Sequence, residues 1–299
     1  MGALISENFG DLLAPGLRKI FVDFYLEQKS MLAALFGMET SSKAQEFDLE
    51  DGPIADFESM TGPIPYDDSV QGYKTTYTHS PYARGFKVAR DLVDDDLYNI
   101  INRKPQKLAM GARRRRETDG ASVLNNAFNA SVTGGDSLSL CNSAHTSRQQ
   151  GIATQSNTGT LQMSPTNVEA TRRLHAAVKD SIGGIINVET DLIIAPLQLE
   201  ETAWEIINSK GKVDTAQNNA NFHFGKYKLA VWKNYLTSAT AWFMTDSSLM
   251  KMSLLWFDRI SPEFFKDKDF DTLQAKFAGY MRYSFGWSDW RFIYGQNPS

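Results

Sequence analysis

The chain has 299 residues, 42% of them hydrophobic and 22% charged, and its formal net charge at pH 7 is −4. These values exclude a disordered chain, allow one large or two modest hydrophobic cores, and indicate a surface that repels nucleic acid overall. The single cysteine, Cys141, excludes an intramolecular disulfide framework, and no apolar run reaches the roughly 18 residues that cross a bilayer, so we expect a soluble, unsecreted protein.

Residues 1–40 carry apolar side chains at a helical spacing that Pro15 interrupts. We predict an N-terminal arm with one or two short helices. Two interpretations stay open at this point: the arm docks its apolar face onto a surface outside its own core, or it is an ordinary core helix. The apolar positions are Leu12, Leu13, Leu17, Ile20, Phe21, Phe24, Tyr25, Met31, Leu32, Leu35 and Phe36.

Between residues 41 and 90 the apolar period changes to two, which is typical of β-strands. Phe47 and Leu49 mark an early strand, and Tyr73 begins a later one. The segment 44–70 contains no lysine or arginine and is rich in aspartate and glutamate. Because an isolated two-stranded ribbon is marginal in water, the sequence predicts a long acidic ribbon that needs a further surface to lie on.

The segment 94–129 is predicted to be one long helix, because its apolar residues recur close to the helical period. Asp94, Asp95 and Asp96 stand where a helix favours an N-cap and negative charge. At about 1.5 Å per residue the helix would span roughly 54 Å, whereas a compact chain of this length has a radius of gyration of about 19 Å. Pro105 predicts a kink, or the end of one helix and the start of another.

Four consecutive arginines, Arg113–Arg116, lie in this helix. Successive helical residues are about 100° apart, so these side chains sweep most of the circumference and cannot all face one partner. We expect some of them to meet acidic groups of the same chain, such as Glu117, or of a neighbouring copy. The others should face water.

The helix 94–129 is as basic as the ribbon is acidic, which suggests that these two kinds of surface meet. The short connection between them makes it awkward for the ribbon to fold back along its own helix, so the helix of an adjacent copy is easier to reach. We therefore predict a contact between subunits. Its expected residues are Asp48, Glu50, Asp51, Asp56 and Glu58 on the ribbon, and Arg103, Lys104, Lys107, Arg113, Arg114, Arg115 and Arg116 on the helix.

The rest of the chain mixes helices and strands without regular alternation, which predicts an α+β fold. A polar loop fills residues 130–163, with Leu138–Cys141 as a candidate short strand. Helices are predicted to begin at Ser164-Pro165 and at Pro196 and to end near the glycines at 183 and 211, and strands are predicted at 192–195, 226–232, 241–245, 252–257, 277–287 and 290–294.

The sequence lacks the common catalytic motifs. It has no glycine-rich phosphate loop, no G-x-S-x-G elbow and no H-E-x-x-H pair. Cys141 and His145 have a spacing that a metal could bridge, but only four histidines exist and no second cluster joins them. We therefore expect no enzyme, no metal and no cofactor, and we keep a hydrolase with a non-local site around His145 or His223 as an alternative.

Five short stretches follow one another along nearly the whole chain. They are Ala89–Tyr98 at the entry to the long helix, Leu124–Phe128 at its end, Leu140–His145, Leu192–Pro196 and Phe285–Arg291. In this order they resemble the major capsid proteins of tailed bacteriophages, the Hong Kong 97 fold, and in particular the Mu-like head-subunit branch. Each stretch alone is a weak signal, whereas the order of all five is fairly specific.

The resemblance implies self-assembly into the pentamers and hexamers of an icosahedral shell that encloses double-stranded DNA. It implies a virion protein that is assembled in the host cytoplasm, with scaffolding, portal and decoration proteins as further candidate partners and no membrane. An encapsulin-like shell around a cargo enzyme stays as an alternative. The implied parts are an N-terminal arm (1–40), an extended loop with flanking strands (41–90), a peripheral domain (91–190) with the spine helix (94–129), an axial domain (191–260) and return strands to the peripheral domain (261–299).

Overall fold

The computed structural model describes residues 9–27, 29–50, 72–89, 100–148, 151–211, 219–269 and 274–298, and scattered positions between 52 and 66. Its helices are α1 (Phe9–Glu27), α2 (Leu32–Leu35), α4 (Ile100–Asn125), α5 (Pro165–Ala176), α6 (Glu200–Asn208) and α7 (Ser247–Ser253), with a short 3-10 helix η2 (Leu197–Leu199). Its strands are β1 (Gly37–Thr40), β2 (Gln45–Leu49), β3 (Lys74–Thr78), β4 (Ser80–Ala89), β5 (Thr158–Gly159), β6 (Leu192–Ala195), β7 (Lys228–Val231), β8 (Trp242–Thr245), β9 (Leu254–Asp269), β10 (Gln274–Trp287) and β11 (Ile293–Gln296). The predicted mixture of helices and strands is confirmed. Within these ranges, none of the helices combines the length and apolar character needed to cross a membrane.

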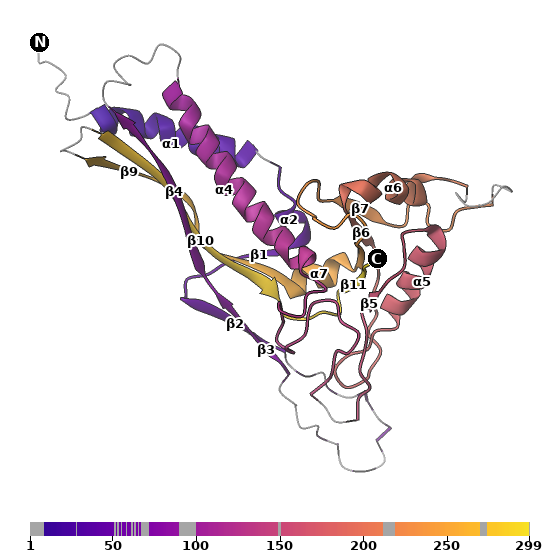
Figure 1. Cartoon of the computed structure of the whole chain (residues 1–299). Coiled ribbons are helices and arrows are strands. Elements are labelled where there is room, and N and C mark those ends of the chain that lie inside the picture. The colour runs from indigo at the N-terminus through magenta and orange to yellow at the C-terminus, as the bar shows by residue number, and fades with distance from the viewer. Residues whose placement is uncertain are drawn as a thin grey trace, which may run out of the picture.

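A four-stranded sheet has the order β1-β9-β10-β4, and Figure 1 shows α1 and α4 lying along it. The antiparallel strands β9 and β10 are 16 and 14 residues long, and their register shifts between Tyr280 and Tyr283. Leu17 of α1 packs with Val88 and Phe277 in a small core beside this sheet. The long β9–β10 pair therefore provides the platform on which both helices lie.

Helix α1 shows which interpretation of the N-terminal arm is right for the described part. The helix continues through Pro15. Leu17 and Phe21 are each only 1% exposed, and the Phe21 ring lies 5.6 Å from the ring of Phe264 in β9. The α1 helix is thus a core helix of its own subunit.

A five-stranded sheet has the order β5-β11-β8-β6-β7, and α5 and α6 pack near it. Every residue of β6, β8 and β11 is buried. The Ser164 side chain accepts a hydrogen bond from the backbone N–H of Asn167 at 3.3 Å, which confirms the predicted cap before Pro165. The predicted strand, proline and helix also follow one another, since β6 leads through Pro196 into η2 and α6.

One large hydrophobic core joins the two sheets beneath the second half of α4. Its members include Leu124 of α4 and the aromatic residues Trp232, Trp256, Tyr283 and Phe292. The rings of Trp256 and Tyr283 stack with their centroids 4.5 Å apart. Because this core holds only the second half of α4, the first half of the helix remains partly open to solvent.

Helix α4 differs from the predicted helix at several points. It ends at Asn125, and it runs through Pro105 as one helix, so the predicted end and restart at this proline is wrong. A proline removes one backbone hydrogen bond, and the packing of α4 against α1 and the sheet outweighs that loss. The predicted cap residues Asp94, Asp95 and Asp96 lie outside the described residues.

Other predicted boundaries also move. The boundary at residue 260 falls inside β9, which continues to Asp269. The final strand β11 pairs with β8 of the five-stranded sheet, so the chain does not end in the four-stranded sheet. The candidate strand at Leu138–Cys141 is irregular backbone, and α5 ends at Ala176 instead of near 183.

Two glycines of α4 give a matched test of this packing. A Cβ at Gly120 would clash with the side chain of Leu32 and approach Trp232, whereas a Cβ at Gly111 meets no atom within 4 Å. We expect Gly111→Ala to raise the free energy of unfolding by about 0.5–1 kcal/mol through helix propensity. Gly120→Ala should lower it by about 1–3 kcal/mol through overpacking. Urea titration of the unassembled chain measures both, and equal effects of the two changes would contradict the described contact of α4 with Leu32.

Candidate subunit-interaction surface

Strands β2 and β3 form a separate two-stranded ribbon, which Figure 1 shows at the edge of the molecule. Its apolar residues Phe47 and Leu49 are 56% and 48% exposed. Beyond the ribbon, Ile54, Phe57 and Tyr66 are more than four-fifths exposed, at 81%, 108% and 90%. The described part of the subunit therefore leaves apolar surface on and beyond the ribbon uncovered.

The predicted acidic contact residues lie in different surroundings. Asp48 is half-buried on β2, and Asp56 is exposed. Glu50, directly after β2, has a partner in its own subunit, because Oε1 accepts a hydrogen bond from Arg291 at 3.2 Å. The other two predicted acids, Asp51 and Glu58, lie outside the described residues.

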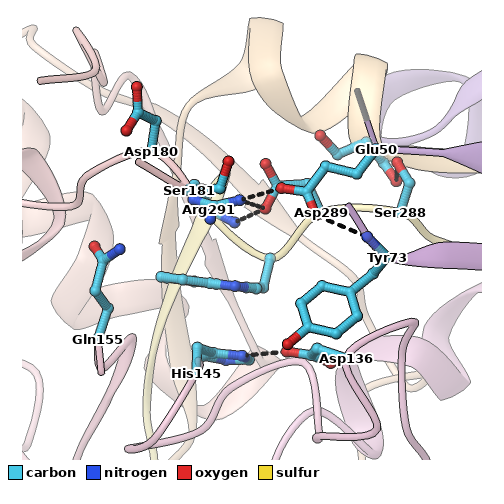
Figure 2. Close-up of polar contacts among 12 residues, drawn as sticks. Glu50, Tyr73, Asp136, His145, Gln155, Asp180, Ser181, Ser288, Asp289 and Arg291 are labelled. Atoms are coloured by element: carbon cyan, nitrogen blue, oxygen red, sulfur yellow. Dashed lines mark hydrogen bonds and ion pairs between the residues drawn. The ribbon is translucent and has the colours of Figure 1, made fainter. Parts of the chain in front are cut away.

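Figure 2 shows how the end of the ribbon is attached to the rest of the subunit. Glu50 Oε2 accepts a hydrogen bond from the backbone N–H of Tyr73 at 3.2 Å, while Oε1 binds Arg291. The Tyr73 hydroxyl donates to the Thr146 carbonyl at 3.2 Å. Arg291 also binds Asp289 at 3.0 Å. Both strands of the ribbon are thus fixed to the body of the subunit where the ribbon ends.

Arg291 is absent from the contact residues predicted from the sequence. The residue is only 9% exposed, and it lies 241 positions from its partner Glu50. A weak signal was present, because a charged residue directly after Trp290 and before the buried Phe292 needs a partner. The identity of that partner is set by the fold and by no local pattern.

Arg116 of the spine helix is enclosed within its own subunit. It is 4% exposed and binds both carboxylate oxygens of Asp258 at 2.7 and 2.8 Å. Its guanidinium carbon also lies 4.9 Å from the Trp256 ring centroid and 5.5 Å from that of Tyr283. The prediction that Arg116 contacts a neighbouring copy is therefore wrong for this residue, because the core already uses its charge.

The other spine arginines point in different directions, as the helical step requires. Arg113 donates to the Tyr25 carbonyl at 3.0 Å, and Arg115 pairs with Asp119 at 2.9 Å. Arg114 is exposed. Glu117, the acid predicted to pair locally, accepts a hydrogen bond from Trp232 at 2.9 Å. The spine arginines therefore divide between internal partners and the surface.

The surface arginines border a groove of about 570 Å³ between α4 and strands β4 and β10. Among the described residues that line it, the charged ones are Arg84, Lys107, Arg114 and Arg115, all of them cations. Tyr82 and Tyr280 contribute aromatic surface, and Arg115 lies 4.9 Å from the Tyr82 ring centroid. Of the remaining predicted basic residues, Arg103 is exposed and Lys104 donates to the Lys87 carbonyl at 3.2 Å. The groove is therefore suited to an acidic segment that also carries apolar side chains.

The histidines considered for catalysis are bound by structural partners. His145 has Nδ1 2.7 Å from Asp136 and Nε2 3.1 Å from Asn157. Burial lowers the pKa of His223, whose Nε2 lies 3.1 Å from a backbone carbonyl. Burial raises the pKa of the Cys141 thiol, and the described residues contain no group of three or more side chains that could hold a metal. Neither histidine has a ring nitrogen left over for a substrate.

Comparisons with known proteins identify relatives of the chain. A family model described as phage capsid protein matches residues 72–295. The chain is similar to a subunit of the procapsid of bacteriophage JBD30, with a TM-score of 0.57 and 12% identity over 99% of this chain and 77% of that chain. It is also similar to a chain of Microbacterium phage Oxtober96, with a TM-score of 0.57 and 8% identity over 91% and 92% of the two chains. A chain of the capsid of an empty GTA particle gives a TM-score of 0.57 and 13% identity over 91% of each chain. No curated protein sequence matches.

Replacing Arg116 and Arg114 separately tests the division of the spine arginines. Arg116→Met should lower the free energy of unfolding by about 3–5 kcal/mol, because it leaves the Asp258 carboxylate partly buried without its partner. Arg114→Met, one position earlier and exposed, should change it by less than about 0.5 kcal/mol. Urea denaturation of the unassembled chain distinguishes the two. A similar small effect at both positions would show that Arg116 does not anchor the helix.

Proposed function

The chain belongs to the phage capsid protein family, and from this premise we propose that it is the major head subunit of a tailed phage, of the Hong Kong 97 type and its Mu-like branch. Formation of a capsid is its function, and its place is the capsid of the virion. We further propose that the shell is icosahedral, encloses double-stranded DNA and is assembled in the cytoplasm of the host cell. The observation that carries the proposal is the ribbon, whose apolar residues its own subunit leaves exposed.

The structural parts suggest a division of labour within the shell. We assign the four-stranded sheet with α1 and α4 to a peripheral domain, and the five-stranded sheet with α5 and α6 to an axial domain around the five-fold and six-fold axes. The ribbon and the segment that follows it form the extended loop. Because β9 is continuous, the boundary between the two domains is better placed before Leu254 than at residue 260.

The contact between subunits joins the acidic ribbon of one copy to the basic groove of the next. Asp48 and Asp56 supply negative charge, and Phe57 and Tyr66 supply apolar surface. The groove supplies Arg84, Lys107, Arg114 and Arg115. Each exposed ion pair contributes at most about 1 kcal/mol, so the contact becomes strong only when it is repeated around a closed shell. Scaffolding, portal and decoration proteins are proposed as further partners on the family resemblance alone.

The other two readings of the sequence have less support. An encapsulin-like shell around an enzyme is not favoured, since the matching family model is that of a phage capsid protein and it covers most of the chain. A hydrolase would need a free catalytic group in a cavity. The ring nitrogens of His145 and His223 are held by Asp136, Asn157, Tyr227 and a backbone carbonyl. These contacts support a structural role.

Electron microscopy tests the proposal most directly. The chain is expressed alone and together with the structural genes of its phage, and the purified material is imaged. We expect closed shells of uniform diameter, and we expect DNA inside those that are made during infection. A protein that remains monomeric under both conditions would contradict the proposal, and shells that contain a single enzyme would favour the encapsulin-like alternative.

Charge reversal tests the contact between ribbon and groove. Asp48→Lys with Asp56→Lys should raise the protein concentration needed for assembly by about tenfold, which corresponds to the loss of about 1.4 kcal/mol per contact. Lys107→Glu with Arg114→Glu should have the same effect. All four changes in one chain restore opposite charges across the contact, and assembly should recover. Light scattering follows assembly, and thermal melting of the unassembled variants controls for folding. Failure of the fourfold variant to recover would refute this pairing.

A further inference from the structure

Trp290 lies between two side chains at the end of the ribbon. Its ring stacks on the imidazole of His145, with the centroids 4.1 Å apart and the planes inclined by 8°. The guanidinium carbon of Arg291 lies 5.1 Å from the same ring system. Because the imidazole already covers one face of the indole, we infer that the guanidinium lies over the other. Figure 2 shows Arg291 beside Glu50 and Asp289, and His145 apart from it beside Asp136.

His145 is held in a fixed orientation. Its two ring nitrogens face oxygen atoms of Asp136 and Asn157. The Asn157 amide cannot turn, because its Nδ2 donates to the Leu140 carbonyl at 2.8 Å and its Oδ1 accepts from the backbone N–H of Asn142 at 2.8 Å. Both imidazole nitrogens thus face oxygen atoms that are themselves fixed, and these contacts hold the ring in one orientation.

The side chain that packs on each face of Trp290 is connected to one strand of the ribbon. On one face, Arg291 binds Glu50 at the end of β2 at 3.2 Å. On the other face, His145 is followed directly by Thr146, whose carbonyl accepts a hydrogen bond from the Tyr73 hydroxyl before β3 begins. The backbone N–H of Tyr73 also donates a hydrogen bond to Glu50, which joins the ends of the two strands directly. The two strands of the ribbon are therefore connected to opposite faces of the Trp290 ring.

We propose that this cluster, the ribbon latch (Glu50, Tyr73, His145, Trp290 and Arg291), sets the direction in which the chain leaves the ribbon at Glu50 and returns at Tyr73. Arg291 and His145 are its positioning residues, and the Trp290 ring, which packs against both, couples them. The role of the latch in assembly rests on the proposed function, because a ribbon held at the wrong angle cannot reach an adjacent copy. The existence of the latch itself does not depend on assembly.

Hydrogen exchange of the unassembled chain tests the latch without any need for a shell. The variants are Glu50→Gln, Tyr73→Phe and the two combined, all of them conservative changes at partly exposed positions. We expect amide exchange in segments 45–50 and 72–78 to rise roughly fivefold in each single variant and further in the double variant. Exchange in α4 provides the internal reference, and Glu39→Gln on β1, which precedes the ribbon in the chain and pairs with β9, is the matched control. Unchanged exchange in the double variant would overturn the latch.

His145→Gln tests the coupling through Trp290, because the His145 ring stacks on Trp290 and its two ring nitrogens are held by Asp136 and Asn157, which lie outside the ribbon. A folded His145→Gln chain with faster exchange at 45–50, the strand that Arg291 holds through Glu50, supports the coupling through Trp290, whereas unchanged exchange there overturns it. Assembly is then compared by electron microscopy. A double variant with normal thermal stability should form fewer closed shells than the wild type, and a normal yield despite a loosened ribbon would overturn the role in assembly. If the wild-type chain forms no shells, the proposed function fails while the exchange result still decides on the latch.

Discussion

The buried ion pair between Arg116 and Asp258 is the interaction on which most of this architecture depends. It joins the middle of α4 to the long strand β9 through two short hydrogen bonds. The next residue, Glu117, accepts hydrogen bonds from Ser30 at 2.5 Å and from Trp232 at 2.9 Å. One turn of helix therefore connects the N-terminal segment, the four-stranded sheet and the core toward the second sheet. Because an unpaired buried charge is costly, this arrangement permits only one register of the helix.

This internal anchoring decides which charges remain for other copies of the chain. Once Arg116 faces the core, the 100° step of the helix directs Arg114 to the surface, and Lys107 lies in the same groove two turns earlier. Among the described residues, no ion pair joins the acids of the ribbon to these groove cations; Glu46 pairs with Lys43 and Glu50 with Arg291. The subunit thus pairs the buried Arg116 and Arg291 internally, and the described acids of the ribbon form no ion pair with the cations of the groove. A chain that must stay soluble alone and associate with itself needs this separation.

Local patterns in the sequence predicted those elements whose residues are buried along their whole length. Leu192–Ala195 and Trp242–Thr245 are entirely buried, and both were predicted as strands from apolar runs alone. The outer half of β9 could not be found in this way, because Glu263, Lys266 and Asp267 interrupt its apolar pattern while β10 supplies its hydrogen bonds. The four arginines predicted that the spine helix has several partners, but not which arginine is inside. That depends on Asp258, which lies 142 positions from Arg116.

Local sequence patterns also predicted only part of the candidate contact surface. The structure adds residues to it that change its composition. The sequence predicted a contact between acidic and basic residues. It did not predict that Arg84 of β4 lines the same groove as Lys107 and Arg114, because that depends on how β4 packs beside α4. Exposed ion pairs alone would contribute little and would accept any acidic segment. A groove lined by Tyr82 as well as cations also selects for apolar side chains, which the segment after the ribbon provides. In the contact that we propose, recognition requires both charge and shape, so that a misplaced copy would gain only the weaker part of the contact and would dissociate before the shell closes around it.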